Sequence, residues 1–179
     1  MTPLARALGG YRARTDVEAA DLDRVRARLA GGDPWDRSTP LHVTGSALIV
    51  HPPTRRVLLR WHARQRAWLQ VGGHADPGET EPLAVALRES REETGLDDLV
   101  PWPDSSIIHV AVVPVVAARN EPAHEHVDLR FVLATGNPDA ARPEHDGADV
   151  QWLSIVEARE LTGRDNLRET LDRLGSLLA

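Results

Sequence analysis

Three glutamates, Glu89, Glu92 and Glu93, lie close together in one segment of the chain. On a helix they occupy positions i, i+3 and i+4, so three carboxylates project from one face with neighbouring Cβ atoms about 5–6 Å apart. They would stand in the last two turns, where the helix dipole is negative, so the dipole and their mutual repulsion both oppose them. A hard divalent cation that prefers oxygen ligands is the best compensation for this charge.

A pair of glycines, Gly72 and Gly73, precedes the glutamates. Backbone carbonyls at such a turn can approach a metal ion closely, because glycine has no Cβ to obstruct them. Magnesium typically binds one or two protein carboxylates together with substrate phosphates. The segment therefore predicts Mg²⁺, with Mn²⁺ as the alternative, in contact with a phosphorylated substrate. Such an ion can polarise a phosphoryl oxygen and lower the pKa of a bound water, while a spare carboxylate takes the proton.

A solvated surface helix is the alternative interpretation of the same glutamates. Arg88 and Arg91 would then neutralise them through surface ion pairs worth a few tenths of a kcal/mol each. The glycine turn, Glu79 and a helix stop at Gly95 all occur beside the glutamates, however. This combination favours the metal site.

Short branched apolar runs separated by turns predict the strands that position this helix. One helix is predicted to begin at Pro82 and to end at Gly95, and a second to cover 166–178, where leucines recur on one face. Strands that flank helices without strict alternation indicate an α/β sandwich. The strands are predicted over 43–50, 57–61, 68–71, 107–117, 127–134 and 150–153.

Residues 1–40 differ in character from the rest and predict an N-terminal extension. Leu22, Val25 and Leu29 recur at helical spacing among many charges, and glycines with a proline follow, which predicts one amphipathic helix and a linker. Residues 41–179 are then expected to form a single domain.

The bulk composition narrows the class of protein. The chain has 179 residues, 41% of them hydrophobic, which is enough for one sizeable core. No cysteine is present, which excludes disulfides, thiolate zinc sites and a cysteine nucleophile. The formal net charge of -6 gives no basic surface for polymeric nucleic acid. No apolar segment is long enough for a membrane span or a signal peptide, so a cytoplasmic protein without a membrane partner is expected.

The segment from Gly72 to Leu96 resembles the Nudix box, G-x5-E-x7-R-E-U-x-E-E-x-G-U, where U is a bulky apolar residue. Eight residues rather than seven separate the box glutamate from the box arginine, which predicts a bulge before the helix. Ser90 occupies the first U position. The matching residues are Gly73, Glu79, Arg88, Glu89, Glu92, Glu93, Gly95 and Leu96.

The resemblance implies the Nudix fold, an α/β/α arrangement in which helices sandwich a mixed β-sheet. It also implies site roles: Glu92 and Glu93 as metal ligands, Glu89 as a ligand or the general base, and a carbonyl of the glycine loop, at Gly73, as a further ligand. Glu79 and Arg88 would form the pair that orients the loop against the helix.

The implied reaction is attack by water on one phosphorus of a diphosphate in a small nucleotide or a nucleoside-diphosphate-linked compound. Nucleoside triphosphates, dinucleoside polyphosphates, ADP-ribose and nucleotide sugars all remain open as substrates. The alternative function is a Nudix-fold regulator that binds a nucleotide without hydrolysing it. The isomerase branch of the fold is excluded, because it relies on a cysteine. The oligomeric state is open, with a homodimer as the commonest form.

Several ionisable and aromatic residues outside the box are further candidates. His124 and His126, with Glu125 and Asp128, could form a transition-metal site or contact phosphates, but a polar loop before a strand is the favoured interpretation. His74 has the better claim to the active site, because it lies in the glycine loop. Trp35 and Trp102 are candidates for base stacking or an interface. A general base outside the box would come from Glu121, Glu125, Asp128, Glu144 or Asp146.

Overall fold

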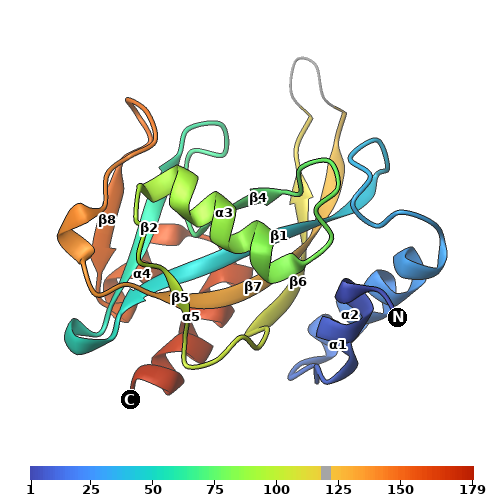
Figure 1. The fold of residues 1–179 in the computed structure, drawn as a ribbon, viewed down its shortest axis with the longest axis horizontal. Helices are drawn as coiled ribbons and strands as arrows, with labels where there is room; N and C mark the ends of the chain where they lie inside the picture. The colour runs from blue at the N-terminus through green and yellow to red at the C-terminus, as the bar shows by residue number, and fades with distance from the viewer. Residues whose placement is uncertain (118–121) are drawn as a thin grey trace.

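A mixed β-sheet between helices forms the body of the protein, as a computed structural model shows (Figure 1). The structure describes residues 1–117 and 122–179. Within these residues the sheet has eight strands: β1 (Leu41–His51), β2 (Arg56–His62), β3 (Ala67–Leu69), β4 (Val71–His74), β5 (Val100–Pro101), β6 (His109–Val115), β7 (His124–Ala134) and β8 (Val150–Leu153). The helices are α1 (Pro3–Gly9), α2 (Asp16–Ala30), α3 (Pro82–Thr94), α4 (Ile155–Thr162) and α5 (Asp165–Leu178). The predicted α/β/α architecture is confirmed.

Strand β1 is the centre of the sheet. It runs parallel to β7 and antiparallel to β2 and β4. Helix α3 covers one face and α4 and α5 cover the other (Figure 1). At Gly45, α3 comes so close that an added Cβ would lie 2.8 Å from the carbonyl oxygen of Pro82. Because side chains alternate along a strand, Thr44 and Ser46 face away from α3.

The helix that carries the glutamates has the predicted ends. Pro82 occupies its first turn, and Gly95 ends it in the left-handed conformation at φ 64°. Ser90 stands where the box has an apolar residue and is fully buried. Its hydroxyl donates to the carbonyl oxygen of Ala86 at 2.6 Å, so its polarity is satisfied within the helix.

The N-terminal segment has two helices where one was predicted. Helix α2 contains the predicted apolar face, but α1 also forms, with Thr2 as its N-cap and Pro3 in its first turn. Seven residues are too short for a periodic pattern, which is why α1 was missed. Leu4 and Leu8 of α1 are buried in the same core cluster as residues of β1 and β7. The division at residue 40 stays a prediction.

The strand predicted over 107–117 is shorter in the structure, where β6 covers His109–Val115, and β5 has no counterpart in the prediction. Two further differences bear on the site. The run 68–71 is split, because Leu69 ends β3, which pairs with β2, whereas Val71 begins β4, which pairs with β1. Strand β7 begins at His124 rather than at Val127, so His124 and His126 lie in a strand and not in the predicted loop.

No helix among the described residues is long and apolar enough to cross a membrane. The cytoplasmic location and the homodimer stay predictions.

Candidate active site

The three box glutamates lie in the last two turns of α3, and Glu93 is the most buried of them. Its side chain pairs with Arg60 of β2 and accepts the backbone N–H of Gly72 at 2.9 Å. Only 7% of Glu93 is exposed, and this burial raises its pKa to about 7. The carboxylate therefore lacks part of the stabilisation that its ionised form needs.

Glu89 lies directly against the glycine turn. An added Cβ at Gly73 would be 2.6 Å from the carboxyl carbon of Glu89, so only glycine leaves room for this carboxylate. Burial raises the pKa of Glu89 as well. Glu92 lies one turn further along α3, and its side chain is half exposed at 53%.

Arg88 links the loop to the helix. Its Nη2 donates to Oε2 of Glu79 at 2.9 Å and to the backbone carbonyl of His74 at 2.8 Å. Its Nη1 lies 2.9 Å from carboxylate oxygens of both Glu89 and Glu92. Hydrogen bonding to Arg88 lowers the pKa of Glu79. The contact between Glu79 and Arg88 thus forms despite the extra loop residue.

The charges around the box do not balance. Arg60 has Glu93 as its closest partner, and Arg88 is shared among the others. Two guanidinium groups therefore face four carboxylates, those of Glu79, Glu89, Glu92 and Glu93. This leaves a negative excess that oxygen-seeking divalent cations suit. The donor set therefore fits a divalent metal ion.

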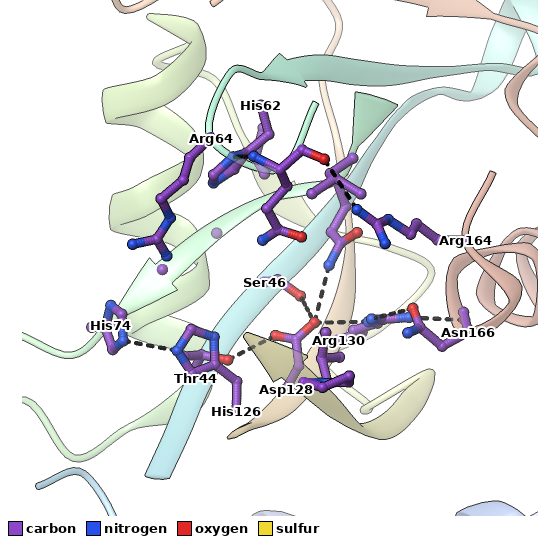
Figure 2. A pocket seen from close by; sticks show the side chains of 18 of the residues that line it. Thr44, Ser46, His62, Arg64, His74, His126, Asp128, Arg130, Arg164 and Asn166 are labelled. Atoms are coloured by element: carbon purple, nitrogen blue, oxygen red, sulfur yellow. Dashed lines mark hydrogen bonds and ion pairs between the residues drawn. The ribbon is translucent and has the colours of Figure 1, made fainter. Parts of the chain in front are cut away.

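A cavity of about 400 Å³ begins at the same glycine turn (Figure 2). Gly72 and Gly73 form part of its wall, and among the described residues four arginines, Arg37, Arg64, Arg130 and Arg164, line it together with one acidic residue, Asp128. Figure 2 shows Arg64 reaching toward the side where His74 lies. The cavity has the size of a small-molecule site and a positive lining that suits an anionic ligand.

Asp128 lies on the floor of this cavity and is held by donors on several elements. Its carboxylate accepts from Thr44 at 3.1 Å and Ser46 at 2.9 Å on β1, and from Gln70 at 3.0 Å (Figure 2). Arg130 of β7 pairs with it at 2.8 Å. Asp128 is therefore a structural anion that shapes the floor.

The sequence of the chain matches the model of the NUDIX domain family over residues 40–174. The protein belongs to the Nudix family. Because relatives of this chain are named as a pyrophosphatase and a probable pyrophosphohydrolase, it is a Nudix hydrolase.

Known relatives match different shares of the chain. An ADP-ribose pyrophosphatase of Mycobacterium tuberculosis is 27% identical over 164 residues, which cover 87% of this chain and 74% of that protein. A probable DHNTP pyrophosphohydrolase of Lactococcus lactis is 30% identical over 109 residues, 58% of this chain and 60% of that one. A solved Ap4A hydrolase of C. elegans gives a TM-score of 0.61 at 18% identity, over 76% of this chain and 96% of its own. Similarity at that level shows the shared fold.

The structure brings all the predicted box residues of this Nudix hydrolase together, and of the candidates for an outside base it places Glu144 near them. Glu125 pairs with Arg24 of α2, away from the box. Glu144 lies 3.8 Å from Arg60, beside Glu93, and Asp146 is exposed. Glu121 lies outside the described residues.

The tryptophans suggested for base stacking do not line the cavity. All five lie among the described residues, and none contributes to its wall. Trp35 and Trp102 instead pack, partly buried, against the two core clusters. Trp61 and Trp68 contact each other edge to face, with ring centroids 5.8 Å apart. A ligand in the cavity therefore meets both polar and apolar side chains, with His62, His74 and His126 as its aromatic neighbours.

His74 lines the cavity next to Gly73, as its position in the loop suggested. Burial, together with the positive fields of His126 and Arg37, lowers the pKa of His74 to about 3, so its ring is neutral at ordinary pH.

The sequence did not reveal the arginines of the site. Arg37, Arg64 and Arg164 come from three separate segments and belong to no motif. Arg60 had a recognisable signal, because it interrupts the apolar run 57–61, and a charge in a buried strand calls for a partner.

Proposed function

We propose that this Nudix hydrolase cleaves a phosphoanhydride bond of a nucleotide or a nucleoside-diphosphate-linked substrate, with Mg²⁺ or Mn²⁺ as its cofactor. The observation that carries the proposal is the excess of carboxylates on α3, which meets an arginine-lined cavity at the glycine turn of Gly72 and Gly73. The carboxylates suit the cation, and the arginines suit the phosphates of the substrate.

Glu92, Glu93 and the carbonyl of Gly73 would hold the metal, and Glu89 would be either a further ligand or the general base. When bound, the ion supplies charge neutralisation for the phosphates and lowers the pKa of water. Arg88 fixes the loop by binding Glu79 and the carbonyl of His74, so that the glycine turn stays against the helix.

The hydrolytic step needs a base, and Glu89 fits this role. Its pKa is raised by burial, which makes its carboxylate a better proton acceptor than an exposed glutamate. Water attacks one phosphorus and gives its proton to the base, the bond from that phosphorus to the bridging oxygen breaks, and two phosphorylated products or a product and phosphate leave. Arg64 and Arg37 would bind the phosphates during this step.

ADP-ribose is the substrate to test first. The relative named for ADP-ribose pyrophosphatase activity matches most of this chain, and the arginine-lined cavity suits a diphosphate. A pteridine triphosphate and nucleoside triphosphates follow, because the second relative is named for DHNTP.

Phosphate or pyrophosphate release, or the appearance of a monophosphate product, would be measured with the purified protein against these compounds. Reactions would contain Mg²⁺, Mn²⁺ or EDTA. We expect turnover with a divalent metal, none with EDTA, and a loss of several orders of magnitude in Glu92→Gln with the fold intact. Glu81→Gln is the matched control, because it makes the same change at an exposed position at the start of α3.

Near-normal turnover in Glu92→Gln would refute the assignment of the box. Binding of nucleotides without any turnover across the panel would instead favour the regulator.

A further inference from the structure

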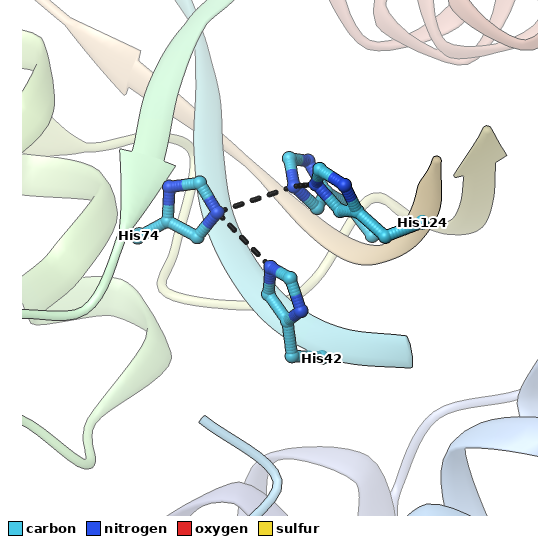
Figure 3. A group of neighbouring side chains, drawn as sticks. His42, His74 and His124 are labelled. Atoms are coloured by element: carbon cyan, nitrogen blue, oxygen red, sulfur yellow. Dashed lines mark hydrogen bonds between the residues drawn. The ribbon is translucent and has the colours of Figure 1, made fainter. Parts of the chain in front are cut away.

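Four histidines from three adjacent strands converge beside the cavity (Figure 3). His42 comes from β1, His74 from β4, and His124 and His126 from β7. One ring nitrogen of each lies within 4.8 Å of those of the others. The glutamate site is carried by α3 on the other face of the sheet, so this cluster is a separate set of ligands.

Strand register explains why the four rings meet. His42 is directly opposite His126 in the parallel pair of β1 and β7, and Thr44, two residues along β1, is opposite His74. His124 and His126 share one face of β7, because side chains two residues apart point the same way. All four therefore project from the face that also carries Asp128.

We propose that His42, His74, His124 and His126 bind one borderline transition-metal ion, with Zn²⁺ as the leading candidate. Within the part of the chain that the structure describes, the group consists of four imidazoles, a ligand set that suits zinc, copper, nickel or cobalt and disfavours magnesium. The Nε2 atoms of neighbouring rings are 3.0 Å apart for His42 and His74, 3.2 Å for His74 and His126, and 2.9 Å for His124 and His126.

These separations match a tetrahedral site. With metal–nitrogen distances of about 2.0–2.1 Å, the ligand atoms of a tetrahedron are about 3.3 Å apart. The three measured contacts fall within a few tenths of an ångström of that value. The remaining ligand atoms lie within 4.8 Å of one another, so the longer separations would close toward that value around an ion.

Two backbone carbonyls orient the rings for this role. Nδ1 of His42 lies 2.9 Å from the carbonyl oxygen of Thr39, and Nδ1 of His124 lies 3.0 Å from that of Pro122. A carbonyl accepts only, so each Nδ1 carries the proton and each Nε2 presents its lone pair to the cluster. Such a carbonyl partner on the outer nitrogen is the usual support of a metal-binding histidine.

Hydrogen bonds between the four rings do not account for all of their close contacts with one another. With Nδ1 protonated on His42 and His124, only His74 and His126 can place a proton on Nε2. Two such protons can serve at most two of the three close Nε2 contacts while the rings stay neutral. A cation at the centre meets all four lone pairs at once.

The proposed ion would hold β1, β4 and β7 together next to the glycine turn. His74 follows Gly73 directly, and its carbonyl accepts from Arg88. The ion would therefore stabilise the strand that positions the glutamate site without being part of it.

Cobalt binding to the purified, metal-stripped full chain tests the proposal. We expect one Co²⁺ per chain with the intense visible absorption of a tetrahedral site, displaced by one equivalent of Zn²⁺. Excess Mg²⁺ should not displace it. Absence of binding at micromolar Co²⁺ and Zn²⁺, or only the weak absorption of an octahedral ion, would overturn the proposal without any variant.

Variants then locate the site. His42→Ala and His124→Ala should each weaken Zn²⁺ binding at least about 100-fold, since loss of an outer-shell partner alone costs 10–100-fold. His145→Ala removes an exposed histidine outside the cluster and should leave binding unchanged, as should Glu92→Gln in the carboxylate site. Folding of each variant would be checked by circular dichroism. Unchanged binding in folded His42→Ala or His124→Ala, or loss of binding in Glu92→Gln, would contradict the assignment.

Discussion

Buried charge is treated in opposite ways in two regions of the molecule. Glu18 of α2 is 1% exposed and meets Arg173 of α5 in a two-pronged ion pair, with Oε1 to Nη1 at 2.7 Å and Oε2 to Nη2 at 3.0 Å. The hydroxyl of Tyr11 and the backbone N–H of Arg14 donate to the same carboxylate. These partners outweigh the cost of burial and lower the pKa of Glu18 to about 2.

Glu93 is almost as deeply buried, yet its pKa moves the other way, to about 7. It has Arg60 and one backbone N–H, with Glu89 and Glu144 close enough to oppose its charge. This difference indicates that Glu18 has a structural role and is consistent with the proposed role of Glu93 as a metal ligand. The charge of Glu18 is neutralised by Arg173 of the same chain, whereas the carboxylates of the box outnumber the arginines beside them.

The largest effect is expected on turnover, when Glu93 is substituted. Glu93→Gln removes one of the proposed metal ligands, so turnover on the substrate identified above should fall at least about 1000-fold, a cost of about 4 kcal/mol in the barrier. The melting temperature of the metal-free variant should be no lower than that of the metal-free wild type, because the amide removes a poorly compensated charge. A variant that melts well below wild type would show Glu93 to be a structural partner of Arg60.

Glu18→Gln should have the opposite outcome. Removing one member of a buried ion pair leaves Arg173 uncompensated and should lower the free energy of unfolding by about 3–5 kcal/mol. Turnover per folded molecule should stay within about twofold. Denaturant titration measures the first quantity and steady-state kinetics the second.

Glu169→Gln is the matched control for this variant. Glu169 pairs with the same arginine at 2.9 Å, but its side chain is 40% exposed. Its loss should cost less than about 1 kcal/mol. Equal losses in the two variants would contradict the view that burial distinguishes the pairs.

Acid should weaken the Glu18 pair in a defined range of pH. The folded-state pKa of about 2 is below the ordinary value of 4.5, so the unfolded chain binds the proton more readily. The stability from Glu18 is therefore fully present above about pH 4.5 and is lost as pH falls toward 2, by about 3 kcal/mol. The free energy of unfolding, measured against pH for wild type and Glu18→Gln, should converge over this range. Parallel curves would show that the pair does not titrate.

The same two regions differ in how well the sequence predicts them. The box could be read directly, because its residues lie within one loop and one helix, where spacing along the chain fixes spacing in space. Its extra loop residue left the contact of Glu79 with Arg88 intact. Glu18 and Arg173 are separated by 155 positions, and no local pattern joins them.

The histidine cluster shows the same limit at a finer scale. The sequence shows His124 and His126 as a pair and favours a loop for them, with Glu125 and Asp128 as companions. Their true neighbours are on β1 and β4, and that depends on strand order and register. The predicted strand began three residues too late, at Val127, so it did not include His124 and His126. The grouping of the histidines therefore could not be predicted, because it depends on which face of the strand each side chain occupies.

Substitution of Glu125 tests this alternation of side chains along β7, and its expected effect is the smallest of the predictions. It lies between His124 and His126 on β7, but its carboxylate turns to the other face and pairs with Arg24, and both side chains are partly exposed at 38% and 43%. Glu125→Gln should therefore change the free energy of unfolding by less than about 1 kcal/mol and turnover by less than twofold. If turnover instead fell 100-fold or more in a folded variant, Glu125 would replace Glu89 as the proposed base, and β7 would have to present its opposite face to the substrate.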